Sequence, residues 1–188
     1  MKRPLITAAA LDYCKTRKKL WLKFFIAFIP AFVVGFVLNC VAFKQDVDIQ
    51  GNSIAVDIEL MFKDFVNVQI SAVAILISFS IAIITILVSA DNPNIKKLKE
   101  KHSTECKVLS NKQPLNLFQV LLSNITYNVF IEVVYLGFLI LCIFLQLYVG
   151  EEIYKWLMAI CVFFIVHVLH ILLESVGQMY LTFWKHEE

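Results

Sequence analysis

The chain alternates long apolar runs with shorter polar segments. Four runs cover residues 24–43, 65–90, 127–149 and 154–173. Each is about as long as the roughly 20 helical residues that cross the hydrocarbon core of a bilayer. Because lipid offers the backbone no hydrogen-bond partners, each run must be helical despite its many Val, Ile and Phe residues. The pattern predicts an all-α membrane protein with four transmembrane helices in a single domain, residues 1–188.

The basic residues between these runs predict the orientation. Residues 1–23 contain seven Lys and Arg residues and residues 91–126 contain six, whereas residues 44–64 contain two Lys residues and five acidic residues. Segments rich in Lys and Arg stay on the cytoplasmic side of a membrane. We therefore expect residues 1–23, 91–126 and 174–188 to be cytoplasmic and residues 44–64 to form an outer loop, with both chain termini inside.

The polar segments have patterns of their own. Between residues 47 and 60 of the outer loop, apolar and polar residues alternate around Gly51-Asn52, which predicts a small extracytoplasmic β-hairpin. Asp91-Asn92-Pro93 is a helix start signal, and a short basic amphipathic helix is expected over 95–108. A second helix starts at Pro114 and continues into the third span. The fourth helix is expected to run on to about Trp184.

Small residues recur every four positions in the first two spans, a spacing that lets helices approach closely in lipid. These positions are Ala27, Ala31 and Gly35 in the first span, and Ala74, Ser78 and Ala82 in the second, where Thr85 and Ser89 lie near the same face. We expect this face of each helix to pack within the chain. The alternatives are an oligomer seam, or a pore lined by the hydroxyls of Ser71, Ser78, Thr85 and Ser89.

Four ionisable residues fall within or beside the last two spans: Glu132, His167, His170 and Glu174. The last three share one helix face, where His170 can reach Glu174. By the predicted topology, Glu132 and Glu174 lie at similar depth near the inner interface. We interpret these residues as structural polar pairs. Ionisable groups in membranes are costly and often functional, so metal binding, a proton relay and pH sensing are the alternatives.

Composition limits the classes of function. With 188 residues, 60% of them hydrophobic, the sequence suits a single membrane domain, and we expect no separate catalytic domain. Its five cysteines are dispersed and are expected to be free thiols. It contains no nucleotide-binding, hydrolase or metalloprotease motif, so we expect no enzyme, cofactor or metal.

The inner segment carries a group of lysines, Lys96, Lys97, Lys99 and Lys101. We interpret them mainly as a topology signal that attracts anionic lipids. The alternative is that they dock an acidic cytoplasmic protein partner. They follow no nucleic-acid-binding module, so direct nucleic-acid binding is not expected.

Residues 71–100, SAVAILISFSIAIITILVSADNPNIKKLKE, join a serine-rich span, an Asp-Asn-Pro turn and a lysine-rich helix. This stretch, and the plan of four spans with inner helices, resembles the membrane subunits of the Kiwa phage-defence systems. The resemblance implies a homo-oligomer in the bacterial inner membrane that senses infection at the envelope and holds a cytoplasmic DNA-binding effector subunit. It assigns no functional residue. We therefore expect a scaffold and sensor subunit, with a pore-forming effector and a small transporter or intramembrane enzyme as alternatives.

Overall fold

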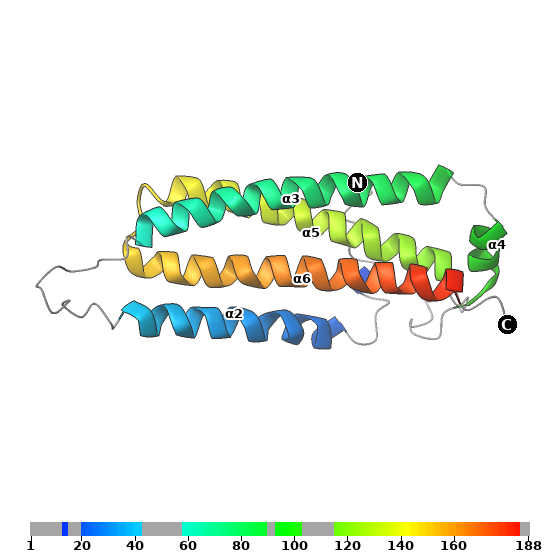
Figure 1. The fold of residues 1–188 in the computed structure, drawn as a ribbon, viewed down its shortest axis with the longest axis horizontal. Helices are drawn as coiled ribbons and strands as arrows, with labels where there is room; N and C mark the ends of the chain where they lie inside the picture. Colours follow the sequence, from blue (N-terminus) through cyan, green and yellow to red (C-terminus); the bar gives the residue numbers. More distant parts are fainter. Residues whose placement is uncertain (1–12, 15–19, 43–57, 90–92, 103–114, 185–188) are drawn as a thin grey trace, which may run out of the picture.

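A computed structural model describes residues 13–14, 20–42, 58–89, 93–102 and 115–184. Four helices in this part of the chain are long, and they lie side by side along one axis (Figure 1). A fifth, short helix lies across one end. The helices are α2 (Leu20–Ala42), α3 (Ile58–Ser89), α4 (Pro93–Glu100), α5 (Leu117–Leu145) and α6 (Glu151–Trp184).

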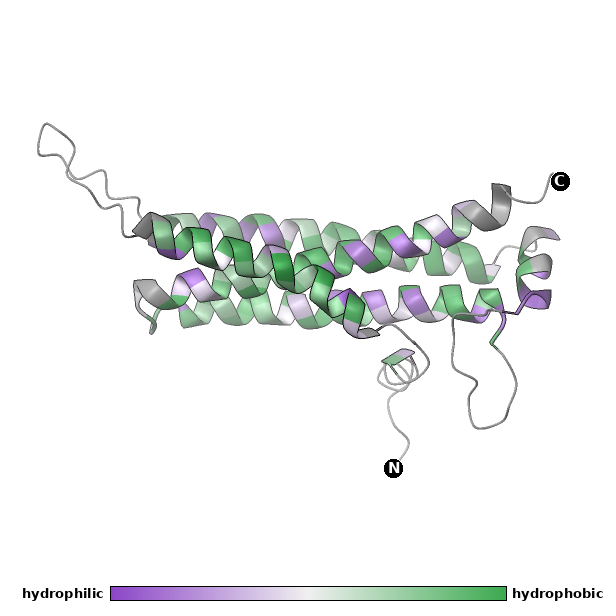
Figure 2. Cartoon of the chain, turned by 90° about the horizontal axis from the view of Figure 1, so that it is seen from below, coloured by the Kyte–Doolittle hydropathy of each residue, from purple (hydrophilic) through white to green (hydrophobic). Residues whose placement is uncertain are grey.

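Each of the four long helices is long and apolar enough to cross a membrane. Apolar residues dominate their length, whereas polar residues dominate α4 (Figure 2). The chain is therefore a multi-pass membrane protein, which confirms the predicted helical class. Below, the end of the bundle where α4 lies is called the α4 end, and the opposite end, where α5 turns into α6, is called the turn end.

The helices extend beyond the predicted spans at several boundaries. α3 begins at Ile58, so residues 58–64 are helical and do not belong to the predicted outer loop. This extension is stabilised by packing, because Phe62 is fully buried in the core. The rest of the predicted hairpin lies in residues 43–57, outside the described residues, and the described part holds only an isolated bridge between His102 and Asn116.

Two helical extensions near the α4 end follow the sequence prediction, whereas α4 ends at Glu100 and residues 101 and 102 of the helix expected over 95–108 are not helical. α5 starts at Leu117 and continues without a break into the span. Its start is fixed by a capping box, in which the Asn116 side chain accepts a hydrogen bond from the Gln119 backbone N–H (2.8 Å) and the Gln119 side chain accepts one from the Asn116 N–H (3.1 Å). α6 runs to Trp184, as predicted.

The antiparallel pair α5 and α6 forms the middle of the bundle, with α3 packed on α5 and α2 packed mainly on α6. The largest core cluster joins α3, α5 and α6, and includes Tyr135, Leu139 and Tyr154. On α3, the buried positions Val66, Val73, Ser80 and Leu87 recur every seven residues. Heptad spacing is typical of helices that pack side by side in left-handed bundles.

The described cysteines, Cys14, Cys40, Cys142 and Cys161, are free thiols.

Candidate functional site

Several polar side chains are buried between helices whose outer surfaces are apolar. Apart from Lys155 near the turn end of α6, they are Ser80, Asn124, Asn128, Glu132, His167 and Ser175. Ser175 bonds only within its own helix, to the Ile171 carbonyl at 2.9 Å. The other five take part in three separate polar contacts between helices. A buried polar group without a partner destabilises a fold, so the pairing of each group decides its role.

The first contact is centred on Glu132, whose side chain is fully buried between α5 and α3. Its Oε1 atom accepts two hydrogen bonds, one from Ser80 Oγ at 3.0 Å and one from Asn128 Nδ2 at 2.8 Å. Ser80 belongs to the heptad seam of α3, and Asn128 lies one turn before Glu132 on α5. The carboxyl group therefore ties α3 to α5 inside the membrane-spanning part of the bundle.

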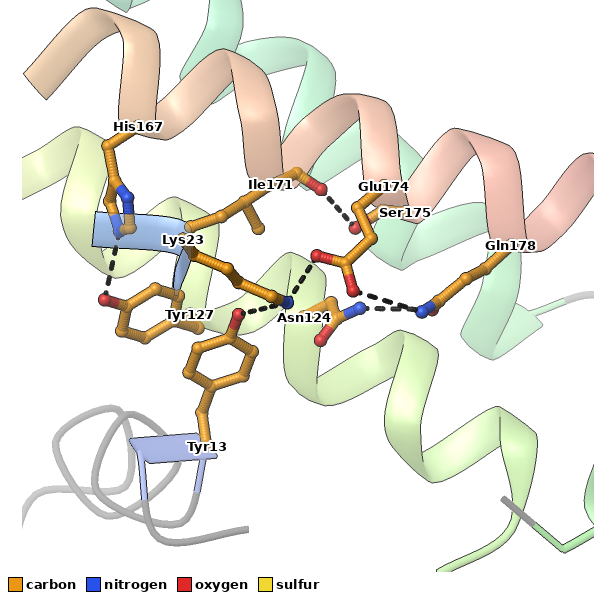
Figure 3. A network of polar contacts seen from close by, with 9 residues as sticks. All are labelled: Tyr13, Lys23, Asn124, Tyr127, His167, Ile171, Glu174, Ser175 and Gln178. Carbon is orange, nitrogen blue, oxygen red and sulfur yellow. Dashed lines mark hydrogen bonds and ion pairs between the residues drawn. The ribbon is translucent and has the colours of Figure 1, made fainter. Parts of the chain in front are cut away.

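The second contact joins α2 to α6 and α5 nearer the α4 end (Figure 3). Lys23 forms an ion pair with Glu174 and also donates a hydrogen bond to the Tyr13 hydroxyl at 3.2 Å. Gln178 Nε2 donates to Glu174 Oε1 at 3.4 Å, and Asn124 Nδ2 donates to Gln178 Oε1 at 3.1 Å. The two charges are only 12% and 24% exposed, so water screens them incompletely.

The third contact surrounds His167 on α6. Its Nε2 atom lies 3.3 Å from the Tyr127 hydroxyl on α5, and its ring stacks on Phe24 of α2 with centroids 4.8 Å apart. Tyr127 in turn stacks on Tyr13 with centroids 4.0 Å apart. His167 therefore lies where α2, α5 and α6 meet, and its polar edge faces α5.

Two expectations about these residues are wrong. Glu174 pairs with Lys23 on another helix, and no described bond joins it to half-buried His170. The lysine supplies the positive charge of this ion pair. Glu132 and Glu174 also lie at different depths. Because Asn124 lies beside Gln178 and Tyr135 stacks on Phe164, Glu132 lies opposite the region of α6 near Val168. That is about six residues, or about 9 Å, from Glu174.

The four ionisable candidates therefore do not form one site. Among the described residues, no group of three or more His, Cys, Asp and Glu side chains is arranged to hold a metal ion. The structure brings in partners that the sequence analysis did not single out, namely Lys23, Ser80, Asn124, Asn128 and Gln178. One signal was available, because Asn124, Asn128 and Glu132 recur every four residues within an apolar run.

The two stripes of small residues lie in different environments. Ala27, Ala31 and Gly35 are buried where α2 meets α6. On α3, by contrast, Ser71, Ser78, Ala82, Thr85 and Ser89 are exposed, as is Ala74. The expected packing of the α3 stripe within the chain is therefore wrong, because the heptad seam on the other side of α3 makes the contact with α5.

The exposed hydroxyls of α3 bond to their own helix. Ser71, Ser78, Thr85 and Ser89 donate to the carbonyl oxygens four residues earlier, at 3.2, 3.0, 2.9 and 2.6 Å. Such bonds satisfy the hydroxyl proton without a partner helix, so these serines and threonines are compatible with contact to lipid.

The lysine group lies on and beside α4. Ile95 and Leu98 are buried against the bundle, whereas Lys96, Lys99 and Lys101 are exposed. Lys99 Nζ lies 5.1 Å from the centroid of the Phe118 ring on α5, at a distance suited to a cation–π contact. The side chain of Lys97 lies outside the described part of the structure. α4 therefore rests its apolar side on the bundle and turns basic side chains outward.

Comparisons with known proteins identify no relative of this chain. A scan against protein-family models, a search of curated proteins and a search of solved structures each found no match.

Proposed function

We propose that the chain is a membrane-embedded, homo-oligomeric scaffold and sensor subunit that holds a cytoplasmic protein partner. The proposal places both termini and α4 on the cytoplasmic side of the bacterial inner membrane, as the distribution of basic residues predicts. The proposed role in anti-phage defence rests on the resemblance of residues 71–100 to Kiwa membrane subunits.

The position of α4 carries the proposal. A basic helix held only by lipid headgroups would have no fixed orientation relative to the bundle. Here Ile95 and Leu98 fix α4 on the ends of α5 and α6, so the exposed residues Lys96, Lys99 and Lys101 contribute basic side chains to the surface at a fixed place on the bundle. Such a surface suits an acidic protein partner, because complementary charge steers association and fixes orientation.

The polar contacts supply a physical connection between α2 and this surface. Lys23 on α2 pairs with Glu174, which leads through Gln178 to Asn124 on α5. One turn before Asn124, Leu121 packs in a cluster that includes Phe118, the residue beneath Lys99. These contacts, with one turn of α5 between Asn124 and Leu121, form a continuous path from α2 to α4. A shift between two packings of the bundle would be transmitted from α2 to α4 along this path.

Charge reversal tests the docking surface. The full-length protein would be co-expressed with the products of its neighbouring genes, and the variant Lys96→Glu/Lys99→Glu compared with Lys63→Glu. Lys63 is an exposed lysine near the turn end and serves as the matched control. We expect the double variant to insert normally and to recover at least about tenfold less partner, in line with the loss of a few interfacial charges. Full recovery of the partner, or no partner with the unaltered protein, would overturn the proposal.

A second candidate is a pore-forming effector in which several copies surround the α3 stripe. The observation that favours it is the exposure of Ser71, Ser78, Thr85 and Ser89 along one side of α3. If this stripe lines a water path, Ser78→Leu should reduce ion flux through liposomes that contain the protein. Flux that is absent from the unaltered protein, or unchanged in the variant, would exclude this candidate.

A further inference from the structure

Two buried oxygen atoms at the Glu132 contact have no described hydrogen-bond donor. Both hydrogen bonds to the carboxyl group end on Oε1, and no described group donates to Oε2. Asn128 uses its amide Nδ2 for one of these bonds, and its carbonyl oxygen Oδ1 has no described donor either. Both side chains are fully buried. The unsatisfied atoms therefore belong to the same two side chains that are already joined by one hydrogen bond.

An ionised carboxylate would leave this contact poorly stabilised. A carboxylate only accepts hydrogen bonds, and so does the Asn128 carbonyl oxygen, so neither can satisfy the other. The negative charge would also lack a counter-ion inside a membrane bundle, which is costly.

The charged and titratable groups on the surrounding helices do not supply that counter-ion. On α3 they are Glu59, Lys63 and Asp64, which begin at least 16 residues from Ser80, a distance of about 24 Å along the helix. On α2, Lys23 pairs with Glu174 of α6. On α6, His170 lies near the level of Glu132 but makes no described ion pair with it, and Lys155 lies 13 residues before Val168, or about 20 Å along the helix. His167 contacts the Tyr127 hydroxyl of α5, and the Tyr135 hydroxyl of α5 donates to Gln69 at 3.3 Å.

One proton on Glu132 Oε2 would satisfy both unpaired atoms. The acid O–H would donate to Asn128 Oδ1 while Asn128 Nδ2–H donates to Glu132 Oε1, which closes a cyclic acid–amide pair. A bound cation fits less well, because the two free oxygens fall short of the six or more oxygen ligands that hard cations take. The donors and acceptors present at this contact therefore match a carboxylic acid.

We propose that Glu132 is a proton-binding site inside the bundle, where its carboxylic acid forms a cyclic hydrogen-bonded pair with Asn128 and receives Ser80 from α3. The proton is thereby coupled to the α3–α5 contact, because its loss would introduce a charge and draw water between these helices. This inference concerns the bundle alone and does not rest on the proposed scaffold function.

Infrared spectroscopy of the full-length protein in lipid nanodiscs tests the protonation state directly at neutral pH. The difference between the unaltered protein and Glu132→Gln should contain a carboxylic-acid carbonyl band that shifts in deuterium oxide. Glu174→Gln is the matched control, and it should remove a carboxylate band, because Glu174 is paired with Lys23. Loss of a carboxylate band in Glu132→Gln would overturn the proposal.

Thermal unfolding gives a second readout that does not depend on assigning bands. Gln has one donor group and one acceptor, so Glu132→Gln can close the same cyclic pair with Asn128. We expect its melting temperature within about 2 °C of the unaltered protein, and that of Glu132→Leu lower by more than about 4 °C. If Glu132→Gln fails to fold or melts as low as Glu132→Leu, the site requires the negative charge and the proposal is wrong.

The variant Asn128→Leu tests the partner. It removes the acceptor for the acid proton but leaves the bond from Ser80, so the carboxylic-acid band should persist and shift in frequency. An unchanged band would show that Asn128 does not receive the proton, and would overturn the cyclic pair.

Discussion

Two helices of this bundle carry the same sequence feature and use it differently. α2 and α3 both place small residues every four positions, yet Ala27 and Ala31 are buried against α6 whereas Ala74 and Ser78 are exposed. The difference lies in what else each helix offers. α3 also carries a heptad of buried residues that includes the larger Val66, Val73 and Leu87, and Val73 and Ser78 are separated by about 140° around the helix axis. The small-residue stripe therefore determines packing only where no larger apolar seam competes with it.

The partner helix matters as well. A Cβ atom added to Gly35 would lie 3.3 Å from Ala159 Cβ, which is tighter than ordinary contact. α2 and α6 thus approach closely because both have small residues at the crossing, as helices in lipid do. Small residues at every fourth position allow one helix to approach another closely. Whether it does so depends on the size of the residue that faces them on the neighbouring helix.

The largest effect is expected from filling that crossing. Gly35→Leu should destabilise the protein by about 1–3 kcal/mol or more, because the added side chain forces α2 away from α6. Gly137→Leu on α5 is the matched control, because nothing lies within 4 Å of the Cβ position at that exposed glycine. The measurement is thermal unfolding in nanodiscs, and equal melting temperatures for the two variants would show that α2 is not held by this contact.

The ion pair is the next largest contribution to holding α2 on α6. Lys23→Met leaves the Glu174 carboxylate without its lysine in a partly buried position, and we expect a loss of up to about 3 kcal/mol. Lys63→Met removes an exposed lysine and should have little effect.

A charge swap separates the pair from general effects of charge. Lys23→Glu/Glu174→Lys should recover part of the stability lost in each single variant, because the pair is re-formed with reversed polarity. Additive losses in the swap would mean that the two groups do not interact in the membrane.

The sequence predicted the long elements of this fold well and their contacts poorly. The four spans follow from the length of the apolar runs, because lipid leaves the backbone no alternative to a helix. The extension of α5 from Leu117 and of α6 to Trp184 follows from apolar spacing beyond those runs. Each of these features depends on the residues of a single segment, so it can be predicted from the sequence of that segment alone.

Contacts between segments depend on which faces meet. Lys23 was interpreted only as a topology charge, yet it lies within reach of Glu174, 151 residues later. His170 shares a helix face with Glu174 and is within reach of it by spacing alone, but Glu174 pairs with Lys23 of α2 instead. Ser80 lies in an apolar run and has no local signal. The sequence therefore identified three of the polar groups that matter, Glu132, His167 and Glu174, but not their partners.

The smallest effect is expected on the exposed side of α3, and it sharpens the contrast with Gly35. Ser78→Leu should change the stability of the isolated chain by no more than about 0.5 kcal/mol, because its hydroxyl bonds only to the Ala74 carbonyl and its side chain is exposed. Unfolding would be measured in dilute detergent, where copies are separated, and the mass of the assembly would be measured in nanodiscs at higher concentration. A change in mass without a change in stability would mean that the α3 stripe contacts a second copy. A loss of stability comparable to that of Gly35→Leu would mean that the stripe is packed within the chain, and would remove the distinction between the two helices.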